Sequence, residues 1–335
     1  METATSTTTI LPTLRQAAVK EGLLQPGGAR SLLHFGGLIA AWAALVSIGF
    51  AADTLWVWVP VWILVAFIII GFGGVAHDCV HGTVFNSRLA NSVLGHIAFL
   101  GLGVPFTNYR QYHLLHHADT LGEFDPEGPG QNFKSRAQYA LFHLALGPGF
   151  IVFIWLSSLG GALHRPPKWA RTESSQRVLR YGWFPGILSF AGLITLAVES
   201  NTFRHIWLGP WLFVMVPVLA FVLCGEHYAG RAEDGTLKNT YTLTSNPLMR
   251  FAIFNINFHT VHHLLPRVPG PALQRMNEIT APYEENAFSG YLAFHRHVLA
   301  PLPWFAPRDA SSASRLRALN AGALNSAGEV LRKEV

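Results

Sequence analysis

Residues 54–81 read TLWVWVPVWILVAFIIIGFGGVAHDCVH, an apolar run that ends in two histidines. From 54 to 76 the run carries no Asp, Glu, Lys or Arg, and as a helix it is long enough to cross the apolar core of a bilayer. His77 and His81 lie four residues apart, so their imidazoles share one helix face. The stretch predicts a membrane helix that presents two potential metal ligands at its end.

Two further clusters repeat this pattern: His113-Leu-Leu-His116-His117 and His259-Thr-Val-His262-His263. Composition alone would give roughly 0.04 matches to HxxHH in a chain of this length, whereas the sequence has two. In the alternative interpretation, each histidine finds its own hydrogen-bond partners or solvent, in a core or on a surface, and binds no metal. That interpretation suits scattered residues such as His34 and His96. The three clusters instead indicate bound metal.

The composition is that of a membrane protein, because half of the residues are hydrophobic, 13% are charged and the mean hydropathy is +0.29. Uncharged stretches long enough to span a bilayer are 31–52, 54–76, 181–198 and 205–225. Two more, 89–109 and 137–163, are ambiguous. We therefore expect an all-α integral membrane protein with four transmembrane helices in two hairpins, interfacial helices and a cytoplasmic, histidine-rich metal-binding cap.

The number of membrane crossings, four, follows from the side of the membrane on which the histidine clusters lie. If the clusters share one site, an even number of crossings separates any two of them, so 89–109 should lie in the interface. Of the three stretches between the second and third clusters only two can span, and we expect 137–163 to dip into or lie along the membrane because Gly147-Pro148-Gly149 interrupts it.

Charge supports this arrangement. The two short loops on the opposite face, around Asp53 and from Glu199 to Arg204, hold one of the 24 Lys and Arg residues, namely Arg204. The other 23 lie with both termini and the clusters, which the positive-inside rule places in the cytoplasm. This basic face is either simply solvated or a docking surface for an acidic partner. Nothing in the sequence favours nucleic-acid binding.

The ligand count favours two ions. His227 follows the last span and brings the imidazoles to nine, whereas a structural zinc ion is filled by four ligands. Iron suits a redox site, and zinc would imply hydrolysis. With only Cys79 and Cys224, a disulfide framework or a cysteine-rich cluster is excluded. The nearby carboxylates Asp78, Glu226, Asp119 and Asp125 are either partners of ligand histidines or solvated charges at helix ends.

HxxxH, HxxHH and HxxHH in this order resemble the boxes of the membrane fatty acid desaturases and related hydroxylases. The resemblance extends to Glu226-His227, Asn239-Thr-Tyr-Thr, Asn246-Pro247-Leu248 and the run from His259 to Pro269, and covers about residues 35–280. It implies a cytoplasmic diiron centre that uses dioxygen and two electrons from a carrier to attack an acyl C–H bond. The iron ligands that it implies are His77, His81, His113, His116, His117, His227, His259, His262 and His263.

One position departs from that pattern. Relatives carry Asn four residues before the isolated histidine, where it contacts iron through water, and this chain has Leu223 there. Asn255, four residues before His259, is a tentative substitute, and Asp78 and Glu226 are tentative partners of the ligands. As a capping residue, Asn255 would have a purely structural role.

The resemblance also suggests the organisation of the chain: a cytoplasmic N-terminal segment at 1–30, the membrane fatty acid desaturase domain at 31–306, and a mobile tail at 307–335. The first apolar run starts too late and is too long for a cleaved signal peptide, and we expect a multi-pass protein of a bacterial inner membrane. Because no cytochrome b5 signature is present, electrons must come from a separate ferredoxin, rubredoxin or cytochrome b5-like carrier with its reductase.

The reaction itself stays open at this point. Desaturation of an acyl chain is expected, and hydroxylation, acetylenase chemistry or oxidative decarboxylation to an alkene are alternatives that share the first hydrogen abstraction. A zinc-dependent lipid hydrolase and a non-catalytic metal-binding protein are further alternatives.

Overall fold

The computed structural model describes residues 7–128 and 130–306, and this part is mostly helical, as the sequence predicts. Residues 1–6 of the expected N-terminal segment and the expected tail 307–335 lie outside the described residues. The elements up to the last apolar helix are α1 (Thr7–Lys20), α2 (Gly28–Ala52), α3 (Leu55–His81), α4 (Arg88–Phe99), η1 (Leu100–Leu102), α5 (Phe106–Ala118), α6 (Arg136–Ala162), α7 (Glu173–Tyr181), α8 (Phe184–Glu199), α9 (Asn201–Phe203), η2 (Arg204–Leu208), α10 (Gly209–Phe213), η3 (Val214–Val218) and α11 (Leu219–Leu223).

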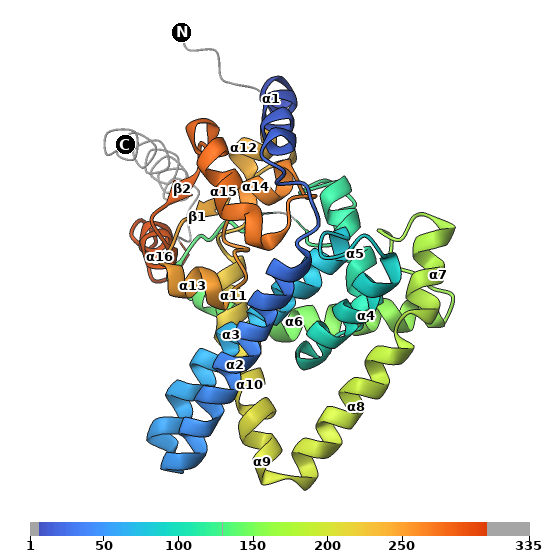
Figure 1. Cartoon of the computed structure of the whole chain (residues 1–335), viewed down its shortest axis with the longest axis vertical. Helices are drawn as coiled ribbons and strands as arrows, with labels where there is room; N and C mark the ends of the chain where they lie inside the picture. Colours follow the sequence, from blue (N-terminus) through green and yellow to red (C-terminus); the bar gives the residue numbers. More distant parts are fainter. Residues whose placement is uncertain (1–6, 129, 307–335) are drawn as a thin grey trace.

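The C-terminal elements are short, and α12, α14 and α15 lie beside α1 (Figure 1). They are η4 (Ala232–Asp234), α12 (Thr236–Asn239), β1 (Thr242–Leu243), α13 (Pro247–Ala252), α14 (His259–Leu264), α15 (Gly270–Thr280), η5 (Ala281–Tyr283), β2 (Ala287–Phe288) and α16 (Tyr291–Leu299). The parallel pair of β1 and β2 is the only sheet in the part of the chain that the structure describes. Leu14 of α1, Val261 of α14 and Met276 of α15 are fully buried in one small core, so the N-terminal helix and the C-terminal segment form one layer.

Five helices are long and apolar enough to cross a membrane: Gly28–Ala52, Leu55–His81, Arg136–Ala162, Glu173–Glu199 and Asn201–Leu223. A bent pair, Arg88–Leu102 and Phe106–Ala118, would make a sixth if it counted as one span. All four spans expected from the sequence are among the five. The additional one is α6.

The expected interruption of α6 is wrong, because the helix runs unbroken through Gly147-Pro148-Gly149. A Cβ on Gly147 would clash with the carbonyl oxygen of Met215, so this glycine allows α6 to cross directly over the backbone of η3. In Figure 1 α6 runs across the directions of α2, α3 and α8. The glycines serve close packing here and do not end the helix.

The 89–109 stretch is not a straight helix either, since the chain bends by 99° between η1 and α5. On α4 the exposed residues Leu89 (74%), Val93 (52%) and Ile97 (58%) recur every four positions, so one face is apolar and open. Such a face suits a helix that lies in a membrane interface.

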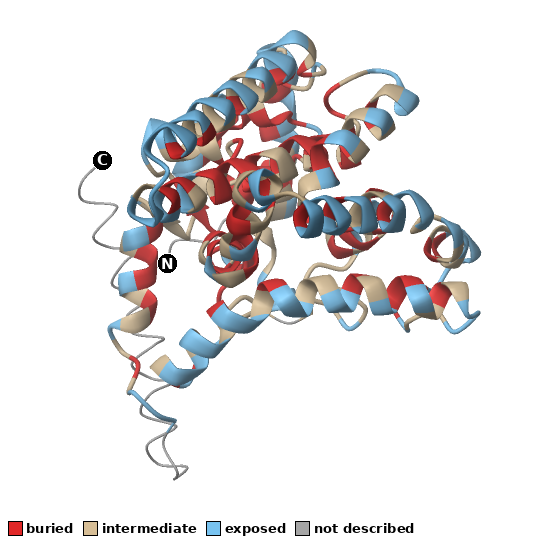
Figure 2. Cartoon of the chain, turned by 90° about the horizontal axis from the view of Figure 1, so that it is seen from below, coloured by how far each residue is buried: buried red, intermediate tan, exposed pale blue. Residues whose placement is uncertain are grey.

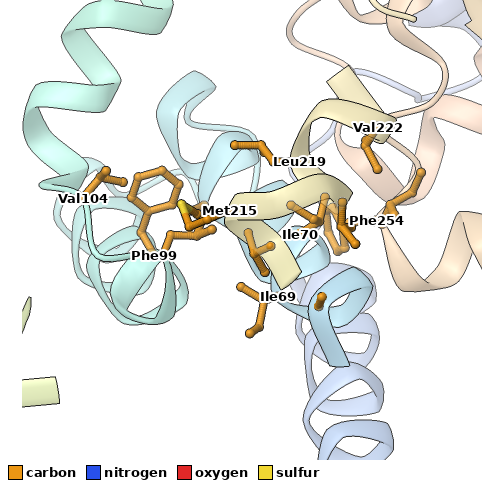
Figure 3. Packing of buried hydrophobic residues seen from close by; sticks show 14 of the residues in the cluster. Ile69, Ile70, Phe99, Val104, Met215, Leu219, Val222 and Phe254 are labelled. Carbon is orange, nitrogen blue, oxygen red and sulfur yellow. The ribbon is translucent and has the colours of Figure 1, made fainter. Parts of the chain in front are cut away.

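Burial is concentrated where the helices meet, and the outer faces of the long helices are exposed (Figure 2). Those outer faces are apolar: Trp56 on α3 is 92% exposed and Leu188 on α8 is 60% exposed. Exposed apolar side chains on long helices are what contact with lipid requires. Inside, Ile70 of α3, Phe99 of α4 and Met215 of η3 pack in one large core (Figure 3).

Candidate metal centre

All nine histidines implied by the sequence come together in two neighbouring groups. His77, His81, His113, His117 and His262 form one, here the five-histidine set, and His116, His227, His259 and His263 form the other, the four-histidine set. Within each set, the potential ligand atoms lie within 4.8 Å of one another. Residues as far apart in sequence as 77 and 262 therefore meet at one place.

Helix geometry explains how each HxxHH box serves both sets. On α5, His113 and His117 are separated by four residues and share a face, whereas the intervening His116 turns to the neighbouring set. On α14, His259 and His263 face the four-histidine set and His262 faces the other. Each box thus bridges the two sets.

Hydrogen bonds fix which nitrogen of a ring is free. Nδ1 of His116 donates to Asp125 at 2.9 Å, and Nδ1 of His227 donates to the carbonyl of Asn239 at 2.9 Å. Each bond leaves the lone pair on Nε2, which is the arrangement found in metal-bound histidines. Because Asp125 also accepts from the backbone amides of Leu121 and Glu127, its carboxylate is held in place.

The Nε2 atoms point at one another. Nε2 of His227 lies 3.1 Å from Nε2 of His116 and 2.9 Å from Nε2 of His259, and in the other set Nε2 of His117 lies 2.8 Å from Nε2 of His262. Two nitrogens at about 2.1 Å from one ion lie about 3.0 Å apart at a right angle and about 3.4 Å apart at the tetrahedral angle. The residues present therefore fit two metal ions.

The surroundings keep the imidazoles of the third box, His259, His262 and His263, in the neutral form. Burial, followed by the neighbouring imidazoles, lowers the pKa of His259, His262 and His263 well below 6.5. A neutral imidazole is the form that binds metal. These rings are consequently ready ligands at neutral pH.

Two partly buried carboxyls lie beside the sets. Oε1 of Glu226 is 3.7 Å from Nδ1 of His259, and Oε1 of Glu127 is 3.4 Å from Nδ1 of His113. Burial raises the pKa of Glu226 well above its usual range, and the charge of Glu127 adds to that shift. Burial also raises the pKa of Glu127. Nearby cations would favour ionisation of both groups.

The other tentative residues have structural contacts. Asp78 accepts a hydrogen bond from the backbone amide of Gly270 at 2.7 Å, and the side-chain amide of Asn255 donates to the carbonyl of Gly270 at 3.0 Å. Both residues therefore hold the start of α15, directly after the third box. Asp119 accepts from the backbone amide of Phe124 and closes the loop after α5.

Sequence reasoning missed Glu127 and the carbonyl of Asn239. Glu127 lies only two residues after Asp125 in a loop rich in Asp and Glu, so its proximity to the second box was a usable signal. A backbone carbonyl carries no signal in the side-chain pattern, and only the fold brings that of Asn239 to His227.

A cavity of about 160 Å³ extends from the histidines into the apolar core. Six of the nine histidines line it, together with Ile70, Phe99, Met215, Leu219 and Phe254, which Figure 3 labels, and Leu223. Ile70 precedes His77 by seven residues, so the cavity follows α3 for about 10 Å. Its walls suit a long apolar ligand with one segment beside the metal sites.

Comparisons with known proteins agree with this geometry. The family model for fatty acid desaturases matches residues 53–295, which include all nine histidines. Similar proteins are the chloroplastic omega-6 fatty acid desaturase of Arabidopsis thaliana (26% identical; 72% of this chain, 57% of the relative), the sn-1 oleoyl-lipid 12-desaturase of Picosynechococcus (27%; 73% and 74%) and the sn-1 acyl-lipid omega-3 desaturase (ferredoxin) of Synechocystis (26%; 79% of each). The chain spans little more than half of the plant relative. Because the family model covers most of the chain, this protein belongs to the fatty acid desaturase family.

Proposed function

We propose that this protein is a membrane acyl desaturase that holds two iron ions in the four- and five-histidine sets and introduces a double bond into an acyl chain with dioxygen as oxidant. The observation that supports this most directly is the apolar cavity that opens onto both sets of converging Nε2 atoms. A hydrolase would need a polar site for water and a headgroup, whereas this cavity places apolar walls next to the ligands.

The chain's own groups have three tasks in this proposal. The cavity walls bind the acyl chain and exclude water from the reacting carbons. Asp125 and the Asn239 carbonyl orient His116 and His227, and each leaves Nε2 free for an ion. When bound, the iron pair supplies the redox chemistry that activates dioxygen. Acyl-lipid substrates are suggested by the names of the cyanobacterial relatives.

The reaction is tested by product analysis. The full chain, reconstituted in lipid with iron, a reductase and ferredoxin, is supplied with isotope-labelled acyl lipids, and we expect products that have lost two hydrogens. Metal analysis of the active protein should give two irons per chain. Zinc alone, without restoration of activity by Fe(II), would exclude the iron assignment.

A second candidate is hydroxylation by the same centre. One relative, 27% identical over 63% of this chain and 55% of its own length, is described as a putative sphingolipid delta(4)-desaturase/C4-monooxygenase. The name of this relative includes both desaturation and hydroxylation. Products that gain one oxygen, in the assay above, would favour this candidate over desaturation. Loss of carbon dioxide would instead indicate alkene-forming decarboxylation.

For the membrane arrangement we keep four crossings, by α2, α3, the α7–α8 segment and the α9–α11 segment. The course of α6 across the other long helices in Figure 1 and the open apolar face of α4 support interfacial positions for both. Single cysteines at positions 53 and 201, in a background without Cys79 and Cys224, should react with an impermeant reagent from the outside. Labelling of position 165 from that side would show that α6 crosses.

The electron carrier is expected to dock near the five-histidine set. Arg110 and Arg267 are exposed and lie within electrostatic range of His81, and the exposed Arg88 lies near Arg110. An acidic carrier such as ferredoxin, which one relative's name includes, fits this charge. Charge reversal at Arg88 and Arg110 should raise the KM for ferredoxin without changing the iron content.

A further inference from the structure

A third cluster of potential ligands lies outside both histidine sets. It consists of His143 from α6, Cys224 directly after α11, and His295 from α16, with one ligand atom from each within 4.8 Å of the others. All three side chains are buried, with exposures of 9%, 0% and 5% respectively. Neither the iron ligands nor the cavity wall includes any of them.

The hydrogen bonds of the two histidines fix which nitrogen of each ring carries the lone pair. Nδ1 of His143 donates to the carbonyl of Tyr139 at 2.9 Å, and its Nε2 is buried without a hydrogen-bond partner. Nε2 of His295 donates to the carbonyl of Phe221 at 2.9 Å, so Nδ1 carries the lone pair. A ring tied by one N–H to a carbonyl, with a lone pair on its other nitrogen, is the arrangement of a metal ligand.

The fourth group is the hydroxyl of Tyr139, which lies 2.8 Å from Nδ1 of His295. It brings a second side chain of α6, in addition to His143, to the same place. One thiol, two imidazoles and one phenol oxygen around a closed, buried point match the ligand number of a structural zinc site. The orphaned Nε2 of His143 is costly to bury without such a partner.

We propose that His143, Cys224 and His295 bind one Zn²⁺ ion, with Tyr139 completing a four-coordinate shell. Binding converts the Cys224 thiol to a thiolate and the Tyr139 phenol to a phenolate, releases both protons to solvent and breaks the hydrogen bond from Tyr139 to Nδ1 of His295, and the ion is neither oxidised nor reduced. The site ties α16 and α6 to the end of α11. Because Cys224 lies three residues before His227, the ion also holds the turn that delivers His227 to the four-histidine set.

Cobalt substitution tests the site independently of activity. The purified full chain is stripped of metal and titrated with Co²⁺, and we expect a cobalt–thiolate charge-transfer band whose final intensity corresponds to one cobalt–thiolate site per chain. The nine-histidine centre contains no thiolate, so the band reports only on a cysteine site. Metal analysis of untreated protein should also give one zinc per chain.

The two cysteines of the chain provide a matched pair of variants. Cys224→Ser should abolish the band and lose one zinc per chain, while Cys79→Ser, at the other buried cysteine, should keep both. His143→Gln should weaken cobalt binding at least tenfold. The assignment is wrong if the unmodified protein gives no thiolate band, if Cys79→Ser removes it, or if copper or iron occupies the site in place of zinc. The measurement on unmodified protein decides the question even if a variant fails to fold.

Discussion

The two histidine sets differ in how firmly their rings are held. In the four-histidine set, His116 and His227 each donate a hydrogen bond of 2.9 Å to a buried partner, and Glu226 lies beside His259. Among the described residues, the one carboxylate contact of the five-histidine set is the 3.4 Å approach of Glu127 to His113. His81 has a buried Nε2 with no partner.

The two histidine sets also differ in how far their rings are exposed. Three of the five rings in the five-histidine set are only partly buried, against one of four in the other set. Rings that are oriented before an ion arrives lose less entropy on binding it, so the four-histidine set should bind iron more tightly. The looser set is also the one near the exposed arginines, where electrons would enter under our proposal.

The largest effect should follow removal of a ligand. His116→Ala and His81→Ala should each reduce turnover below detection, because both ions are needed. They should differ in iron content: the His81 variant keeps the ion of the four-histidine set, and the His116 variant loses it. Product formation and metal analysis of both variants check this, with His164→Asn, an exposed histidine outside the sets, as control. Retained activity in either variant would remove that residue from the ligands.

The next effect should come from the carboxylate that orients His116. Asp125→Asn should lower iron affinity and activity about 10–100-fold, since the amide cannot accept in the same way from the ring. Asp119→Asn, in the same loop, should leave the affinity nearly unchanged because Asp119 binds only a backbone amide. Equal losses of iron affinity in the two variants would mean that iron binding depends on the structure of the loop and not on the contact between Asp125 and His116.

Chelation should distinguish the two sets in the unmodified protein. We expect iron to leave the five-histidine set about tenfold faster than the four-histidine set, in line with the contribution of ligand-orienting contacts. A one-iron species should therefore accumulate during treatment, as followed by metal analysis and Mössbauer spectroscopy. In Asp125→Asn protein the two rates should converge. Simultaneous loss of both ions from unmodified protein would contradict the difference.

The smallest effect should come from Glu127→Gln. Its contact with His113 is long and its side chain is 27% exposed, so we expect a loss of iron affinity of less than about tenfold. The measurement is the same metal titration used for Asp125→Asn. A loss that matches or exceeds the Asp125 effect would show that the five-histidine set is the more strongly supported of the two.

Local patterns predicted much of this protein. The spacing in each box placed its histidines on one helical turn, and the apolar runs located α2, α3, α8 and the α9–α11 segment. The prediction for α6 erred because Gly147-Pro148-Gly149 has the composition of a break, whereas its role depends on the backbone of η3 that passes over Gly147. No local pattern could show that contact.

The sequence alone determined the inventory of clustered histidines and the membrane class, because three- and four-residue spacing and hydropathy act over a few helical turns. Only the tertiary structure decided which histidines lie in the same set. His116 meets His227 across 111 residues of chain, and His117 meets His262 across 145. Asp125, Glu127 and the Asn239 carbonyl gain their roles in the same way, since a ring nitrogen is oriented by whatever the fold places beside it.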